Sequence, residues 1–479
     1  MLGISGFTGN NPYDTYQRKA IVKLKATYKD SKIVKFMPIF QVRRVINPKG
    51  VWRRWNDNSP FQVTLVRREA PGDAKFKAFN SEGAWRAYID ASTSEFFELE
   101  GGIGKDASGA IIGNTDTPID FKVKFKGAGK ADQSLCGIVK VEYHGFTCQH
   151  TIFVRQGYFQ PIAVVPGGAR WSSFNLFKCA NNTAYGTTWN GKNYISATVT
   201  ASPIALSTLF KRGNYAQGIS VENNQTDHLG PLQCPGTTPF KLMNGNSATW
   251  ANIKGNKTKD FKWGRFEAKV NGQTRRYRVP TLEDFQALMN GAQYGIGVLY
   301  ADGASETATD VDVAYGFYDI DNDATDDHNG VKGKYGGPSG MRGFIVFNPA
   351  TGNQIFFPIG ARGIGRRTNQ SSDDSGNAWT GGQGEAWHGE LRYGSVPVLL
   401  SAWSPKSNPN RPITYNIPGA PGAIYWVNAV EEAAGGTGDV EDMYGWDMNY
   451  FDLNFNPFSS GVVEGNTGDA LPIKLILVE

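Results

Sequence analysis

Four of the five aspartates between positions 319 and 327 have the spacing that best fits a metal ion. Asp319, Asp321 and Asp323 alternate along the chain, as the first carboxylates of a calcium loop do, and Asp327 follows them. Calcium takes roughly six to eight oxygen ligands, and a short acidic loop can supply several of them. An EF-hand also needs a glycine at its sixth position and a glutamate at its twelfth, and neither is present. Calcium is therefore the one cofactor that the sequence suggests, and the alternative is a solvated acidic loop that binds no ion. A melting temperature that does not change at millimolar calcium would exclude calcium binding.

A second group of candidate residues lies near the C-terminus, where aromatic, amide and charged side chains gather. Ring faces stack on sugar C–H groups or on peptides, and neighbouring amides supply directional hydrogen bonds. We expect about half of the rings in this region, which also holds Tyr425, Trp426 and Tyr450, to be core residues, because apolar and polar residues alternate there. The candidate ligand-binding residues are Trp387, His388, Arg392, Tyr393, Trp403, Tyr444, Trp446 and Asn449.

Residues that could carry catalysis are sparse. No G-x-S-x-G or H-E-x-x-H motif occurs, so neither an α/β-hydrolase serine nor a zincin site is supported. The glycine-rich segment at 360–365 lacks the βαβ context of a dinucleotide site. Glu385 and Glu390, with Asp373 and Asp374 nearby, could form a glycosidase carboxylate pair, although carboxylates in a polar loop are usually only solvated. We expect no catalytic residues, and a carbohydrate-active enzyme is the alternative.

The elements that must position these residues are mainly strands. The chain is rich in glycine and aromatic residues, and only 19% of its residues are charged, a composition typical of strands and long loops. No apolar run reaches about 18 residues, so we expect no transmembrane segment. The first 160 residues predict about eight strands, at 20–28, 35–45, 61–67, 85–89, 96–99, 119–125, 137–143 and 147–155.

This series of strands predicts an immunoglobulin-like β-sandwich over residues 1–160. Pro161 and the Pro166-Gly167-Gly168 segment place the domain boundary after it. The first domain is basic, but its lysines alternate with apolar residues as on the solvent face of half-buried strands, so we expect no nucleic-acid partner. The segment at 1–11 shows no signal peptide, so the protein is either not secreted or begins here after a removed leader.

The four cysteines form no C-x-x-C pair. A turn near position 144 would set Cys148 opposite Val141 on the preceding strand, so we expect no bridge between Cys148 and Cys136. A bridge between Cys179 and Cys234 stays open.

The second half, residues 161–479, predicts one clear helix, at 280–289. Thr281 is a suitable N-cap and Asp284 completes a capping box, while Leu282, Phe285 and Leu288 share one face. A shorter helix is expected at 203–211, and residues 289–342 show little regular pattern. Apolar strands are expected at 343–347, 354–358, 396–401, 423–427, 450–455 and 471–478.

Several segments in residues 165–479 resemble segments of one bacterial protein family and follow each other in the same order. They are Trp263-Gly264-Arg265-Phe266, the helix motif that starts at Tyr277-Arg278-Val279-Pro280-Thr281, Gly343-Phe344-Ile345-Val346-Phe347-Asn348, Ile355-Phe356-Phe357-Pro358, Ile424-Tyr425-Trp426 and the segment 468–476. The chain is similar in these segments to the Fibrobacter succinogenes major paralogous domain family and, more distantly, to the formylglycine-generating, sulfatase-modifying family. The first domain ends on Val154-Arg155-Gln156-Gly157, which resembles the close of Bacteroidetes-associated carbohydrate-binding (BACON) immunoglobulin-type modules.

The resemblance implies a C-type-lectin-like α+β domain after the sandwich, and a fold class that is mainly β with minor α. It implies ligand loops at about 385–394, 403–420 and 428–449. The cysteines that formylglycine-type oxidation needs late in the fold are absent after Cys234, and so are the calcium-dependent sugar motifs E-P-N and Q-P-D. A protein or peptide ligand is therefore as strongly expected as a glycan.

These observations lead to one expectation about function. We expect a non-enzymatic recognition protein or adhesin on a bacterial cell surface, in the manner of a fimbrial tip subunit. Its expected partners are a glycan or a host or bacterial surface protein, together with pilus subunits. The alternatives are an enzyme of carbohydrate-active or diverged formylglycine-generating type, and a receptor-binding protein of a phage or injection apparatus.

Overall fold

The protein is described by a computed structural model that covers residues 17–42, 62–80, 83–126, 134–180, 189–224, 232–256, 261–301, 341–367, 387–403, 412–431, 442–461 and 470–478, with short breaks inside some of these segments. Strands make up most of these residues, and α2 (Leu282–Gly291) is the one helix of more than four residues among them. The predicted class, mainly β with minor α, is confirmed. None of the described helices is long and apolar enough to cross a bilayer.

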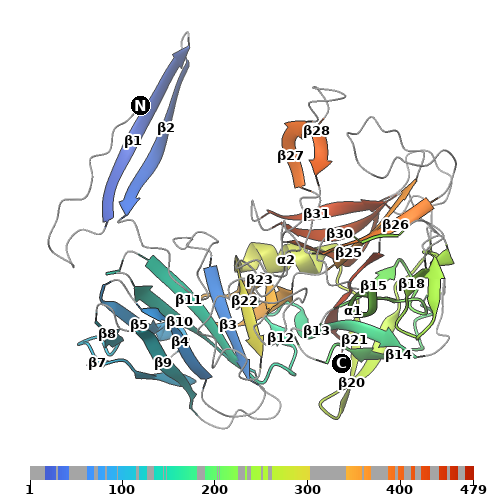
Figure 1. Cartoon of the computed structure of the whole chain (residues 1–479), viewed down its shortest axis with the longest axis horizontal. Coiled ribbons are helices and arrows are strands. Elements are labelled where there is room, and N and C mark those ends of the chain that lie inside the picture. Colours follow the sequence, from blue (N-terminus) through green and yellow to red (C-terminus); the bar gives the residue numbers. More distant parts are fainter. Residues whose placement is uncertain are drawn as a thin grey trace.

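Two sheets pack face to face around residues 74–156 (Figure 1). Trp85, Ile111 and Val139 of one sheet meet Phe121 and Val123 of the other in a buried core. The alternation in the strand sequences produces this arrangement, since every second side chain points inward. The larger sheet has the order β24 (Gln354–Pro358), β23 (Met341–Phe347), β22 (Gln293–Ala301), β3 (Gln62–Arg68), β11 (Cys148–Gln156), β10 (Leu135–Tyr143), β5 (Trp85–Ile89), β8 (Ile111–Gly113) and β7 (Gly104–Lys105), and the smaller sheet has β4 (Ala74–Asn80), β9 (Pro118–Phe125) and β6 (Phe97–Gly101).

The predicted register of the β10–β11 hairpin is wrong by two residues. Cys148 lies opposite Tyr143, and Val141 lies opposite His150. The turn is therefore longer than the sequence suggested, but the conclusion drawn from it holds, because Cys136 lies opposite Arg155 and is a free thiol. Cys179 is also a free, buried thiol, so the bridge to Cys234 is not formed.

Strand β3 joins strands from both halves of the chain. It runs parallel to β11 on one side and parallel to β22 on the other, and the four strands β11, β3, β22 and β23 lie side by side in Figure 1. The larger sheet therefore continues across position 160. The division into domains at 1–160 and 161–479 stays a prediction, and main-chain hydrogen bonds connect its two parts.

Before β3, the chain forms a long hairpin, shown in blue in Figure 1, of β1 (Gln17–Tyr28) and β2 (Ser31–Val42). Its antiparallel register runs from Gln17 opposite Val42 to Tyr28 opposite Ser31. The two strands form a sheet of their own. Both were predicted from their apolar alternation, but the sequence did not indicate that they would pair apart from the sandwich.

Five strands in the second half close into a small barrel. They are β13 (Arg170–Cys179), β14 (Ile195–Val199), β20 (Arg265–Val270), β21 (Gln273–Arg278) and β33 (Lys474–Leu477), and the ring closes because β33 pairs with both β21 and β13. Strand β12 (Ile162–Ala163) pairs antiparallel with the start of β13. Leu176, Phe266, Tyr277 and Leu475 belong to the buried cluster that this barrel encloses. A closed barrel leaves no strand edge unpaired.

Helix α2 packs beside the barrel and the larger sheet. Its buried residues Phe285 and Leu288 belong to a cluster with Trp171 and Phe357, whose rings lie 5.0 and 6.0 Å from Phe285. The predicted capping box is present, since Thr281 accepts from the Asp284 amide and Asp284 accepts from the Thr281 amide. The N-cap is the predicted one, but the helix runs from Leu282 to Gly291, two residues later at each end than the predicted 280–289.

Other segments of the second half form smaller sheets, and some differ from expectation. Residues 208–211 of the predicted 203–211 helix are strand β15, the predicted strand at 450–455 begins only at Asn454, and β22 lies in a stretch where no strand was expected. One sheet has the order β16 (Ile219–Ser220), β15 (Thr208–Lys211), β32 (Ala470–Leu471), β25 (Ala361–Arg367), β26 (Trp387–Tyr393) and β17 (Leu232–Cys234), and another has β29 (Gly422–Glu431), β30 (Asp442–Asn449) and β31 (Asn454–Gly461). The remaining elements are the pairs β18 (Pro239–Lys241) with β19 (Ser247–Thr249) and β27 (Val398–Trp403) with β28 (Pro412–Tyr415), helix α1 (Val221–Asn224) and the short 3-10 turn η1 (Ala91–Thr93).

Buried cations bind main-chain and amide oxygens where the two halves meet. Arg155 of β11 is fully buried and donates to the carbonyls of Gln160 and Gln354, at 2.5 and 3.2 Å. Arg275 of β21 donates to the side-chain oxygen of Gln160 at 2.7 Å. Lys474 of β33 donates to the carbonyls of Ser173 and Phe356. No aspartate or glutamate is buried among the residues whose side chains the structure describes, so these charges depend on oxygens that the strands hold in place.

Replacing Arg155 by methionine tests this dependence. We expect Arg155→Met to lower the free energy of unfolding by about 2–4 kcal/mol, because buried carbonyls lose a charged donor that no water can replace. Chemical denaturation of the full chain measures the change, with the exposed Lys269→Met as control. Equal stability of Arg155→Met and the wild type would contradict the proposed role.

The Asp284 carboxyl makes the stability of α2 depend on pH. Burial acts to raise its pKa, but hydrogen bonds from Arg278 and Thr281 outweigh burial and hold the pKa below its usual value. A carboxyl with a depressed pKa stabilises the fold above its unfolded-state pKa and loses this contribution as the pH falls through the folded-state pKa. We expect Asp284→Asn to cost about 2 kcal/mol at neutral pH, and the difference from wild type to shrink below about pH 4.

Thermal unfolding across pH 2–8 (roughly the range over which the carboxyl titrates) measures this effect. Glu283→Gln is the matched control, because Glu283 is the exposed acid one position earlier in the same helix turn. A constant gap between Asp284→Asn and wild type over the whole range would count against the carboxylate as the cause.

Candidate functional site

The eight candidate ligand-binding residues lie on strands, where the resemblance implied loops. Trp387, His388, Arg392 and Tyr393 belong to β26, and Trp403 ends β27. Tyr444, Trp446 and Asn449 belong to β30, which pairs with β29 and not with β26. Strands β26 and β30 are in different sheets. These backbone placements do not decide whether the eight side chains meet a ligand, so that assignment stays a prediction.

Two rings of the wider aromatic set are core residues, as expected for part of it. Tyr425 and Trp426 of β29 are fully buried. The Tyr425 hydroxyl donates to the carbonyl of Pro358, and the Trp426 indole donates to the carbonyl of Phe210. Burial raises the pKa of Tyr425. Both rings fix β29 against neighbouring strands and are not available to a ligand.

The predicted calcium ligands Asp319, Asp321, Asp323 and Asp327 lie outside the described residues. Within the described segments, no group of three or more His, Cys, Asp or Glu side chains is placed to hold a metal ion. A calcium site and a solvated acidic loop therefore both stay predictions for this segment.

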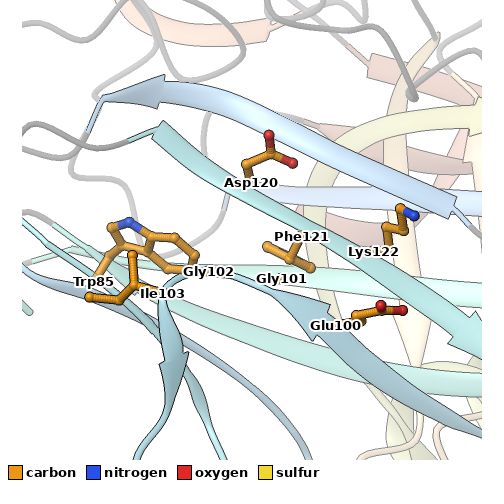
Figure 2. Close-up of a pocket in the computed structure, with 8 residues that line it drawn as sticks. All are labelled: Trp85, Glu100, Gly101, Gly102, Ile103, Asp120, Phe121 and Lys122. Carbon is orange, nitrogen blue, oxygen red and sulfur yellow. The ribbon is translucent and has the colours of Figure 1, made fainter.

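One cavity, of about 500 Å³, lies in the sandwich where the chain passes from β6 to β7. Figure 2 shows Trp85 and Ile103 at one end of it and Glu100 and Lys122 at the other. Ile103 is 58% exposed, but the Trp85 ring is only 1% exposed and offers little face for stacking. Its charged residues carry both signs, and Glu100 pairs with Lys124. This cavity has neither a free ring nor a single type of charge that would select a ligand.

A second cavity, of about 240 Å³, lies at one end of the barrel and is here called the Trp189 pocket. At this end β14 and β20 begin and β21 ends. The pocket is lined by Trp189, Phe261, Lys262, Trp263, Gly264, Arg265, Arg278, Val279 and Asn428. None of these side chains carries a carboxylate, hydroxyl, thiol or imidazole group.

The loop that carries Trp189 is held by its own hydrogen bonds. The Trp189 amide donates to the Lys262 carbonyl, and its indole N–H donates to the Asn193 carbonyl at 3.0 Å. The Asn190 side chain accepts from the amides of Lys192 and Asn193. Gly191 has a φ of +85°, a conformation that favours glycine. The indole is therefore fixed before any ligand arrives.

Cations and rings alternate over this face of the barrel. The Arg265 guanidinium lies 4.3 Å from the centre of the Trp189 ring, and that of Arg276 lies 4.6 Å from the centre of the Tyr194 ring. Such contacts stabilise a partly exposed pair by about 0.5–1 kcal/mol. Arg265 and Arg278 are direct cross-strand partners and so share the outer face of the β20–β21 hairpin.

The ion pairs of this face leave one arginine without an acidic partner. Arg276 binds Glu267 at 3.1 Å, and Arg278 binds Asp284 through both of its terminal nitrogens. Arg265, at the rim of the pocket, has no ion pair with any described residue, and neither has the exposed Lys262. Within the described part of the chain, the pocket therefore combines a fixed indole with positive charge that no acidic side chain compensates.

The floor of the pocket is rigid and aromatic. The Trp263 ring packs against Tyr215, Phe261 and Trp426. The Tyr215 hydroxyl accepts from the Gly264 amide at 2.8 Å, and burial raises the pKa of Tyr215. Trp263 itself is only 4% exposed, and its buried indole N–H has no acceptor among the described residues.

The sequence drew attention to two segments of this pocket, but it gave no indication of Trp189. Two of the segments that carry the family resemblance, Trp263-Gly264-Arg265-Phe266 and Arg278-Val279, both line it. They were not assigned to a site, because the sequence does not show that β20 and β21 bring them together. Trp189 was not singled out, since one tryptophan before an Asn190-Gly191 turn has no distinctive pattern.

Comparison with known proteins adds no relative to this picture. No protein-family model matches the chain, and no curated protein sequence matches it.

Proposed function

We propose that the protein is a non-enzymatic recognition protein of a bacterial cell surface, an adhesin that binds a glycan or a surface protein through its second half. The observation that carries the proposal is the Trp189 pocket, in which a fixed indole and an arginine with no acidic partner among the described residues face the outside of a closed barrel. The surface location and a place in a fimbrial tip rest on the family resemblance alone.

The composition of the pocket supports binding over catalysis. Hydrolytic sites use a carboxylate pair or an activated nucleophile with a base. The side chains that line the Trp189 pocket offer rings, amides and cations instead. A tryptophan gives a large contact area at low conformational-entropy cost, and its fixed loop keeps the cost of ordering on binding small.

A screen of the full chain against glycan and surface-protein arrays tests the proposal. We expect at least one ligand, and we expect Trp189→Ala to weaken its binding about 30-fold, the effect of losing a central tryptophan contact. Tyr294→Ala is the matched control, because Tyr294 is an exposed ring on β22 that does not line the pocket.

Trp387→Ala and Trp446→Ala extend the screen to the sites predicted on β26 and β30. A loss of binding in either of these variants, with Trp189→Ala unaffected, would move the ligand to the C-terminal strands. Turnover of a bound glycan, or the absence of any ligand on either array, would overturn the recognition function. Genomic neighbours would separate a pilus from a phage or injection apparatus.

A further inference from the structure

We propose that the Trp189 pocket binds an anionic saccharide, a sugar that bears a carboxylate or a sulfate group. The inference rests on the proposed recognition function and names the ligand class of that site. In the bound state the acidic group meets Arg265 and Lys262, and the sugar ring lies against the indole rim of the pocket.

The charge of the pocket selects an anion. Arg278 is neutralised by Asp284 and Arg276 by Glu267, whereas Arg265 and Lys262 have no acidic partner in the part of the chain that the structure describes. A guanidinium binds carboxylate or sulfate oxygens through parallel N–H donors, and its contact with the Trp189 ring holds it in one orientation. Arg265 is thus arranged in advance for an acidic ligand.

The floor of the pocket is an apolar surface. Trp263 lines the pocket, and its indole N–H is fully buried, so it is closed off from a ligand there. The polar contacts of a bound sugar therefore fall to Arg265, Lys262 and Asn428.

The surroundings favour a sugar over a peptide. Extended peptides commonly bind by adding a strand to an open sheet edge. Both neighbours of β20 are occupied, by β14 and β21, and the barrel is closed, so no edge is free beside the pocket. The volume of about 240 Å³ suits one sugar unit, and the exposed Asn428 lines it as an amide partner for hydroxyls.

Matched pairs of glycans test the inference with the full chain. Polygalacturonate is compared with its methyl ester, and a sulfated galactan with its desulfated form, by biolayer interferometry. We expect at least one acidic member to bind about tenfold or more tightly than its neutral counterpart, and the preference to fall as salt is added. The two pairs separate carboxylate from sulfate recognition.

Variants locate the acidic group. Arg265→Met should abolish the preference for the acidic glycan, while Arg276→Met, on the same face but outside the pocket, should retain it. Circular dichroism and melting temperature establish that each variant is folded.

The outcomes separate this inference from the proposed function. Equal binding of neutral and acidic glycans, or an intact preference in Arg265→Met, would overturn the anionic class and leave a recognition protein. Binding to acidic proteins alone would do the same. A wild-type chain that binds neither glycans nor surface proteins would remove the proposed function itself.

Discussion

The structure depends on how Gln160 holds two buried arginines. Its main-chain carbonyl accepts from Arg155 of β11, and its side-chain oxygen accepts from Arg275 of β21. A buried guanidinium is stable only if oxygens surround it, because its desolvation is otherwise uncompensated. The sandwich and the barrel must therefore meet in one geometry, since a shift of either would leave a buried charge without its oxygens.

The same junction explains why a composition-based domain boundary and a continuous sheet occur together. Proline and glycine after Gln160 do mark a change of direction, because Pro161 is followed by the short strand β12. Yet Arg155 also donates to Gln354 of β24, and the Gln354 side chain donates to the carbonyl of Val154. Local sequence predicts where the chain turns, but it does not predict which strands on either side of that turn pair with each other.

The alternation of residues predicted strands such as β1, β10 and β23, and the capping box predicted the start of α2, because those features depend on near neighbours. It did not predict four of the five barrel strands, β13, β14, β20 and β21. Thr281 and Asp284, three residues apart, define the helix start without help from the rest of the fold. Strand partners could not be predicted in this way. The parallel pairing of β3 with β22 joins Gln62 to Ile296, and the barrel joins Tyr277 to Leu477, so both depend on contacts between residues far apart in the sequence. The Trp189 pocket could not be predicted from local sequence either, since its walls come from four separate segments.

The closed barrel gives the pocket a property that an open sheet would not. Strands with both edges paired cannot recruit an extended chain, so selectivity at this end must come from side chains and from the shape of the loop. The Trp189 loop is fixed to Lys262 by a main-chain hydrogen bond, and the floor is fixed to Tyr215 through Gly264. A ligand therefore meets surfaces that are already ordered, and little binding free energy is lost in arranging them. Under these constraints a guanidinium that pairs with no described acid and lies beside a fixed ring favours a small, rigid, negatively charged ligand over a flexible one.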